Sequence, residues 1–203
     1  MRFEPVKADP FTPAQVLDGG DVAKLQAEIA RLQRENHALA IALSEMERVA
    51  ERDMLTPLFN RRHFLSAMHQ RIARVHRYGD RIALLYVDVD GLKAINDQFG
   101  HAAGDFALIE IATRLASAIR QGDVLARIGG DEFGILLEKM SANAARLMAN
   151  RMARHIAQEP CHFEGQIINL SASFGVATIE TDDSAEALLG RADAAMYSAK
   201  RLG

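Results

Sequence analysis

The stretch that decides the fold is residues 127–133, which read Arg-Ile-Gly-Gly-Asp-Glu-Phe. Apolar segments lie on both sides, at 124–128 and 133–137, so the two glycines predict the turn of a β-hairpin. Two carboxylates, Asp131 and Glu132, follow this turn directly. Glycine permits close approach of a ligand to the backbone, and phosphoryl transfer needs a carboxylate-held divalent cation and a group that takes a proton. The hairpin is therefore a candidate for such chemistry.

A second pair of carboxylates ends the apolar strand expected at 82–90. Residues 86–90 read Tyr-Val-Asp-Val-Asp, and this alternation places Asp88 and Asp90 on one face. One of the two could cap the short helix expected at 92–98, and Asp90 is better placed for this. Asp88 would then be available to bind a metal ion beside the hairpin acids if the two strands are neighbours. Taken alone, capping or surface exposure explains the pair equally well.

Several polar residues follow this strand, and two of them are spaced to lie on one face of a helix. Lys93 and Asn96 lie three apart and share a helix face. Gly100 and His101 form a turn, and Asp105 is expected to begin the next helix, at 105–119. A carboxylate accepts from the ring N–H and exocyclic amine of guanine, and an amide can meet the remaining polar atoms. Without further context, helix capping is the simpler interpretation of these residues.

The N-terminal part predicts a coiled coil. Residues 1–20 indicate a loose tail, and 21–52 lack Gly and Pro, as one long helix would, with Asp21 as its N-cap. A strict seven-residue repeat predicts a left-handed coiled coil, and Asn36 at a core position favours a parallel dimer in register. A helix packed on its own domain is the alternative, although the stripe is narrow for that. The repeat consists of Val22, Leu25, Ile29, Leu32, Asn36, Leu39, Leu43, Met46 and Ala50.

Residues 53–203 alternate helical and strand patterns. Further helices are expected at 60–78, 142–157 and 184–201, and a long strand within 167–179. Helices placed between mostly antiparallel strands predict an α+β domain built on a palm-like sheet.

Composition narrows the function. The 203 residues carry a formal net charge of −3, whereas nucleic-acid binders are usually basic, so we expect no nucleic-acid partner. Cys161 is the only cysteine, which excludes an intrachain disulfide and a Cys-based metal site. The N-terminus lacks a signal-peptide pattern, and the longest apolar run, 82–87, is too short to span a bilayer. We therefore expect a cytoplasmic protein.

The pentapeptide Gly-Gly-Asp-Glu-Phe at 129–133 is identical to the signature of the GGDEF family of diguanylate cyclases. Other stretches resemble that family's motifs in the same order. The resemblance covers residues 53–203 and implies a palm-like nucleotidyl-cyclase fold with a mainly antiparallel sheet. It also implies that a homodimer condenses two GTP into cyclic di-GMP. Residues 53–62 resemble the family's opening motif, and residues 88–105 resemble its central motif. Residues 173–176 resemble the strand near its end, and residues 192–200 resemble its closing helix.

The resemblance also implies a role for each matching residue. Asp88 and Asp131 would ligate Mg²⁺ or Mn²⁺ with the Val89 carbonyl, and Glu132 would help deprotonate the 3′-hydroxyl or hold metal. The remaining residues would bind GTP. Asn96 and Asp105 would hold the guanine, with His101 nearby and Leu55 lining the base pocket. Lys93 and Lys200 would contact the triphosphate.

Product inhibition is implied in the same way. The family's inhibitory site is an Arg-x-x-Asp at a fixed distance before the signature, and Arg120 and Asp123 stand at that distance. Arginine pairs bidentately with phosphate and stacks on purines, which suits cyclic di-GMP. Arg151 would supply a second contact. The alternative is an arginine in a helix's last turn, where the helix dipole favours a cation.

Two departures from the family pattern affect the expectations. Pro57 replaces the usual glycine of the opening motif, so that turn is expected to be stiffer or altered. The chain ends at Gly203, before an arginine and a final strand usual in the family, so weaker GTP binding or an incomplete sheet edge is expected. Two rival functions remain: an inactive receptor for cyclic di-GMP, which intact Asp131 and Glu132 argue against, and a GTP-sensing scaffold.

Overall fold

The computed structural model describes residues 19–201, and the chain divides into two units between Arg48 and Val49. Helix α1 (Gly19–Ala50) forms the described part of the first unit. The tail expected at 1–20 lies outside the described residues, except for its last two residues, which are helical. Because α1 begins at Gly19, the prediction that Asp21 is its N-cap is wrong: Asp21 lies in the first turn.

Helix α1 exposes its apolar stripe. The large apolar residues of the seven-residue repeat are between 41% and 71% exposed in this single chain. Arg31 forms ion pairs with Glu28 and Glu35 along the surface, at 2.6 and 2.7 Å. Pairs of this kind stabilise a helix only slightly. The exposed apolar stripe is therefore the part of α1 that has substantial area left to bury.

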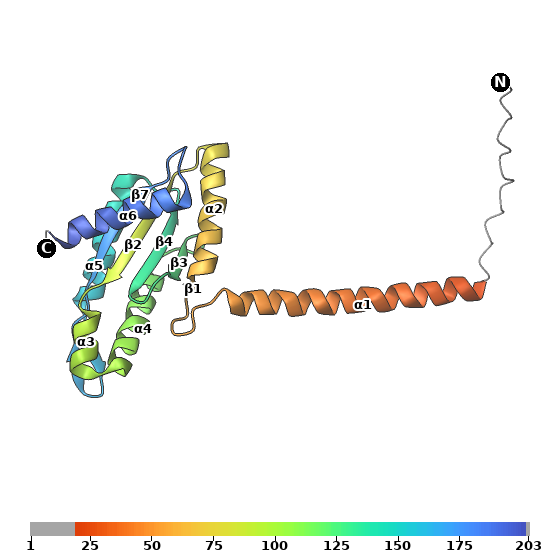
Figure 1. The fold of residues 1–203 in the computed structure, drawn as a ribbon, viewed down its shortest axis with the longest axis horizontal. Coiled ribbons are helices and arrows are strands. Elements are labelled where there is room, and N and C mark those ends of the chain that lie inside the picture. The colour runs from red at the N-terminus through yellow and green to blue at the C-terminus, as the bar shows by residue number, and fades with distance from the viewer. Residues whose placement is uncertain (1–18, 202–203) are drawn as a thin grey trace, which may run out of the picture. The chain divides into compact units, whose positions relative to one another are not determined.

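A five-stranded sheet forms the second unit, with the order β1-β3-β4-β2-β7 (Figure 1). All neighbouring strands are antiparallel except β1 and β3, which confirms the mainly antiparallel α+β fold. The long strand β2 lies between β4 and β7, so the two pairs of carboxylates lie on neighbouring strands. The strands are β1 (Phe59–Asn60), β2 (Ile82–Val89), β3 (Val124–Arg127), β4 (Glu132–Glu138) and β7 (Ala172–Thr178).

Helices cover both faces of this sheet (Figure 1). Alternation along β2 separates two cores: Leu85 and Val87 pack in the core beneath α3, α4 and α5, whereas Leu84 and Tyr86 pack in the core beneath α2 and α6. A two-stranded sheet of β5 (Cys161–Phe163) and β6 (Gln166–Ile168) lies outside the main sheet. The helices are α2 (Arg61–Tyr78), α3 (Leu92–Phe99), α4 (His101–Ala118), α5 (Ala142–Gln158) and α6 (Ala185–Lys200).

Local signals explain most helix boundaries. The side chains of Asn60, Ser141 and Ser184 each accept a hydrogen bond from the backbone N–H three residues later, at the starts of α2, α5 and α6. Gly79 ends α2 with a φ of 68°, a left-handed conformation that glycine adopts without strain. The expected helices at 60–78, 142–157 and 184–201 are thus confirmed to within a residue.

Two expectations around the central motif are wrong. Helix α4 begins at His101 rather than at Asp105, because Gly104 lies inside the helix instead of ending a loop. Asp90 does not cap α3: Gly91 holds the N-cap position, and Asp90 Oδ1 accepts a hydrogen bond from Ser173 Oγ at 2.8 Å.

Candidate active site

The acids of the hairpin and of β2 meet at one end of the sheet. The hairpin predicted around the two glycines is present, with β3 and β4 as its strands. Glu132 lies directly opposite Asp88 in the β2–β4 register. One residue further along, the Val89 N–H donates to the Asp131 carbonyl at 3.0 Å. The structure therefore brings Asp88, Asp131 and Glu132 together, as the sequence analysis required.

Glu132 is held from two sides. Its Oε1 accepts a hydrogen bond from the Tyr86 hydroxyl at 2.7 Å. On the other side lies Gly129: a Cβ added there would stand 3.0 Å from the Glu132 carboxyl carbon and still closer to Oε2. Gly129 therefore leaves the space into which the Glu132 carboxylate folds back.

A lysine bridges Asp88, in β2, and Asp90, which follows this strand. Lys200, in the last turn of α6, forms an ion pair with Asp88, and its Nζ lies 3.6 Å from Asp90 Oδ1. The hydrogen bond to Asp88 raises the pKa of Lys200. The shared face predicted for Asp88 and Asp90 is thus confirmed, and these carboxylates attract a cation.

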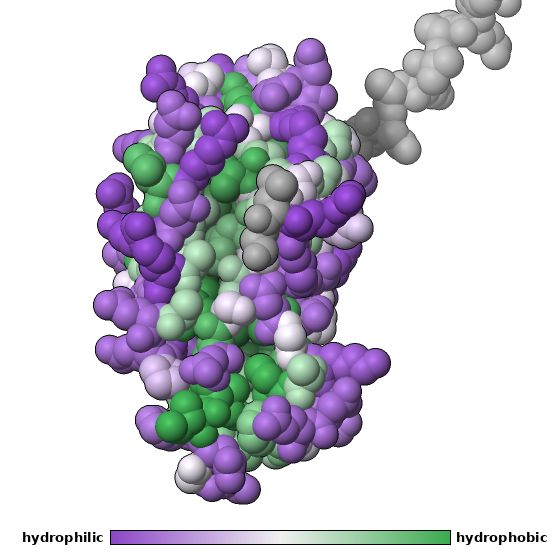
Figure 2. All heavy atoms as spheres, turned by 90° about the vertical axis from the view of Figure 1, so that its left-hand side faces the viewer, coloured by the Kyte–Doolittle hydropathy of each residue, from purple (hydrophilic) through white to green (hydrophobic). Residues whose placement is uncertain are grey.

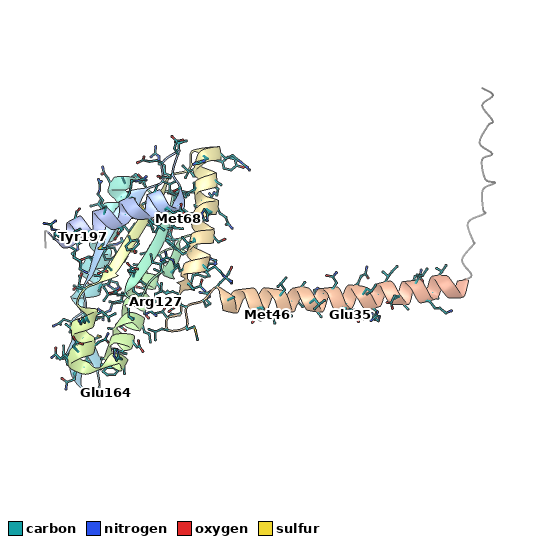
Figure 3. All side chains as sticks on the ribbon, in the orientation of Figure 1. Glu35, Met46, Met68, Arg127, Glu164 and Tyr197 are labelled. Atoms are coloured by element: carbon teal, nitrogen blue, oxygen red, sulfur yellow. The ribbon has the colours of Figure 1, made fainter. Side chains whose placement is uncertain are left out.

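The opening motif is tied to the hairpin through Asp53. Its Oδ1 accepts from the backbone N–H of Leu55 and from both the N–H and hydroxyl of Thr56. Arg127 donates to the Gly130 carbonyl at 2.7 Å and lies 3.4 Å from Asp53 (Arg127 is labelled in Figure 3). Burial raises the pKa of Asp53, but the Thr56 hydrogen bonds and Arg127 outweigh it and lower the pKa overall.

This turn closes despite Pro57. The Asp53 N–H donates to the Leu58 carbonyl at 3.0 Å, and the Pro57 carbonyl accepts from Arg52. The half-buried Leu55 packs against the core that lies beneath α3, α4 and α5. The proline is therefore accommodated as an exposed residue of a hydrogen-bonded turn.

Asn96 stands ready to bind a polar group. Its Oδ1 is one of two buried side-chain polar atoms without a hydrogen-bond partner among the residues that the structure describes. The amide lies against Gly104, where an added Cβ would overlap it. Asp105 follows Gly104 and is exposed, as are Lys93 and His101. An unpartnered buried acceptor is costly, so Asn96 is suited to a ligand that donates a hydrogen bond.

One side of the molecule has a mixed surface. Figure 2 shows a band of apolar side chains running down the middle of this face, bordered on both sides by hydrophilic ones.

Comparisons with known proteins agree with this geometry. Residues 50–203 match the model of the family described as "Diguanylate cyclase, GGDEF domain". The chain belongs to the GGDEF family.

Three relatives illustrate the match. The diguanylate cyclase DgcP of Pseudomonas aeruginosa is 38% identical over 91% of this chain and 27% of its own length. A sensory box/GGDEF family protein from Caulobacter crescentus is 38% identical, with a TM-score of 0.71 over 75% of this chain and 99% of that one. The coiled coil and GGDEF domain of DgcB from C. crescentus, in complex with c-di-GMP, give a TM-score of 0.79 at 26% identity, over 88% and 95%.

The match covers only part of each curated relative. The chain spans less than half the length of the first curated relatives it matches.

The divalent cation that the GGDEF family implies fits the acids described above. No group of three or more His, Cys, Asp or Glu side chains in residues 19–201 forms a ready metal cage. Mg²⁺, however, is usually held by one or two carboxylates plus substrate phosphates and water. Asp88 near the end of β2 and Asp131 directly before β4 meet that need, and the Lys200 ammonium paired with Asp88 shows that this carboxylate accepts a positive charge.

The Arg-x-x-Asp stretch of the GGDEF domain forms a tight turn. Asp123 accepts from the Arg120 N–H at 3.0 Å and from the Glu138 N–H at 3.0 Å, so its carboxylate is fixed. Helix α4 ends at Ala118, so Arg120 lies beyond it. The alternative explanation, that Arg120 is an arginine in the last turn of a helix, is therefore wrong. Arg151, on α5, is exposed and donates to the sulfur of Met148.

Several residues that support the site were missed. Tyr86 could have been found, because the alternation that pairs Asp88 with Asp90 also places Tyr86 on their face. Arg61, which donates to the Ile128 carbonyl at 3.0 Å, gave no signal in the sequence. Nor did Arg127, whose partner Asp53 lies 74 residues away.

Proposed function

We propose that this chain is a diguanylate cyclase that condenses two GTP into cyclic di-GMP and two pyrophosphates. The observation that carries the proposal is the convergence of Asp88, Asp131 and Glu132 at one end of β2 and β4. The unpartnered Oδ1 of Asn96, on the next helix along the chain, supports guanine as the base. The named diguanylate cyclases among the relatives support the same reaction.

Each copy would hold one GTP. The 3′-oxygen of each nucleotide attacks the α-phosphate of the other: a P–O bond forms, the bond between the α- and β-phosphates breaks, and pyrophosphate leaves. Glu132 would take the proton of the 3′-hydroxyl. Positioning and charge stabilisation dominate such transfers, so two half-sites must face each other.

Mg²⁺ or Mn²⁺ would be held by Asp88, Asp131 and the Val89 carbonyl. When bound, the ion neutralises charge that develops on the phosphates. Lys200 already reaches Asp88, so it is close enough to contact a triphosphate held there, and Lys93 on α3 would add a second cation. Asp105 beside the Asn96–Gly104 contact would accept from guanine, with His101 and Leu55 nearby.

The coiled coil would bring the two half-sites together. The repeat from Val22 to Ala50 makes a stalk on the order of 40 Å long at 1.5 Å per residue. Its exposed apolar stripe, with Asn36 in the middle, supports a parallel homodimer in register. A parallel pair holds both catalytic domains, 53–203, at the same end and raises their local concentration.

Product inhibition would act at the Arg-x-x-Asp turn. Arg120 is exposed, and Asp123 is fixed by two backbone N–H groups. The Arg120 guanidinium would donate to cyclic di-GMP, and the Asp123 carboxylate would accept from it. Arg151 would add a second cation. GTP as substrate and cyclic di-GMP as product also support a cytoplasmic location.

The proposal is tested with Glu132→Gln. The amide keeps the size of the side chain but cannot take a proton, so we expect cyclic di-GMP formation from GTP and Mg²⁺ to fall at least a hundredfold. Affinity for 3′-deoxy-GTP should stay within about threefold, because this analogue lacks the 3′-hydroxyl that Glu132 would contact. Near wild-type turnover by product chromatography would contradict the assignment.

A further inference from the structure

Tyr86 lies on the same strand face as the catalytic acids. It stands two residues before Asp88 in β2 and pairs with Gly134 in β4, while Asp88 pairs with Glu132. The Tyr86 side chain therefore lies diagonally across from Glu132, a separation that a long aromatic side chain can bridge. Its hydroxyl meets Glu132 Oε1 at 2.7 Å, the short distance of a hydrogen bond to a charged acceptor.

The ring of Tyr86 is held firmly. Only 9% of the residue is exposed, and it belongs to the core beneath α2 and α6. Opposite it, Gly134 has no side chain, and the ring of Phe64 occupies the space where a Cβ would be. A packed aromatic ring loses little freedom when its hydroxyl makes a bond, so the hydroxyl is presented to Glu132 in one place.

A cavity of about 160 Å³ lies beside this ring, on the side of α2 and α6. Its lining includes Arg61, Tyr86, Ile128 and Asp193. The Tyr86 hydroxyl donates to Glu132 from beside this cavity.

The second oxygen of Glu132 has little freedom either. It folds over Gly129, where a Cβ would collide with it. With one oxygen bound by Tyr86 and the other placed over Gly129, the carboxylate has a single orientation before any substrate is bound. Preorganised groups of this kind avoid a reorganisation cost during the reaction.

We propose that Tyr86 is a positioning residue, which fixes the Glu132 carboxylate in the orientation needed to take the proton of the 3′-hydroxyl. This inference rests on the proposed cyclase function. Tyr86 acts through Glu132 and contacts neither nucleotide. Its loss should therefore lower kcat and leave substrate binding intact.

The test is a double-mutant cycle. Tyr86→Phe removes the hydroxyl and keeps the ring. Glu132→Asp keeps a carboxylate but shortens the side chain by one methylene, which withdraws it from the tyrosine. Tyr78→Phe is the matched control, since Tyr78 ends α2 and is 69% exposed. Pyrophosphate release gives kcat and KM, calorimetry gives the affinity for 3′-deoxy-GTP, and circular dichroism gives Tm.

We expect Tyr86→Phe to lower kcat about tenfold, because small misplacements of a reacting group are costly. KM and 3′-deoxy-GTP affinity should stay within about twofold, and Tyr78→Phe should behave as the unmodified protein. In the Glu132→Asp background, Tyr86→Phe should cost less than about twofold, because the bond it removes is already lost.

Three results would overturn the inference: unchanged kcat in Tyr86→Phe, an equal loss in both backgrounds, or a joint loss of Tm and nucleotide affinity. A crystal structure of Tyr86→Phe provides a readout that needs no turnover. A displaced Glu132 carboxylate supports the inference, and an unmoved one contradicts it. If the unmodified protein makes no cyclic di-GMP, the proposed function fails, and the crystal structure still decides whether Tyr86 positions Glu132.

Discussion

Replacement of Gly129 by alanine tests whether the space beside the hairpin is reserved for Glu132. The φ of Gly129 lies outside the left-handed region, so alanine is compatible with the backbone. The added Cβ would stand 3.0 Å from the Glu132 carboxyl carbon and 3.1 Å from its Cβ, whereas ordinary contacts begin at 3.4 Å. The carboxylate, which lies closest, must therefore swing away and give up its bond to Tyr86.

The size of the effect follows from that displacement. A shift of about 1 Å in a reacting group can cost on the order of a hundredfold in rate, so we expect kcat to fall by about that factor. Stability should change by less than about 1 kcal/mol, because the Glu132 side chain is only half-buried, and alanine restricts the unfolded chain by ~0.4–1 kcal/mol. The expected signature is a large loss of kcat in a fully folded protein.

Pyrophosphate release and thermal unfolding measure both quantities. Gly190→Ala in α6 is the control, because an added Cβ meets no atom within 4 Å there. It should raise stability by about 1 kcal/mol, as expected for glycine replaced in a helix, and leave kcat unchanged. A Gly129→Ala protein with kcat within threefold of the original would refute the argument that Glu132 needs this space.

Three further predictions concern recognition, inhibition and assembly. Asp105→Ala should weaken GTP binding by calorimetry about tenfold to a hundredfold, because an unmatched polar group costs ~1–3 kcal/mol; equal binding of ATP and GTP by the unmodified protein would contradict a guanine pocket. Arg120→Ala should keep the initial rate and abolish the slowing of turnover as product accumulates, and retained tight cyclic di-GMP binding would place inhibition elsewhere. Deleting residues 1–48, which keeps the Ala50 carbonyl that accepts from Asn60 at 2.7 Å, should leave a folded monomer by light scattering with much lower specific activity at low concentration; full activity of that monomer would contradict the role of the coil.

Features set by neighbouring residues were predictable from the sequence. The Gly-Gly turn with apolar segments on both sides gave the hairpin, and Asn60 and Ser184 stand where α2 and α6 begin. Alternation along β2 placed Asp88 and Asp90 on one face. In each case the physical cause lies within a few residues: a turn conformation, a cap, or the period of a strand.

Features set by distant residues were not predictable. Gly104 resembles a helix breaker, but it lies inside α4, where the Asn96 side chain occupies the space that a Cβ would take. Asp90 resembles a cap, but Ser173, 83 residues away, satisfies it. Lys200 reaches Asp88 across 112 residues. Propensity and periodicity carry no information about such pairs, which form only when the sheet and α6 assemble.

The stoichiometry of the reaction products tests most directly whether this chain is a diguanylate cyclase. The purified chain is incubated with GTP and Mg²⁺, and cyclic di-GMP and pyrophosphate are measured over time by chromatography and an enzymatic assay. We expect two pyrophosphates for each cyclic di-GMP, with no product in the absence of a divalent cation. GTP that stays intact, or is converted only to GDP and phosphate, would contradict this expectation.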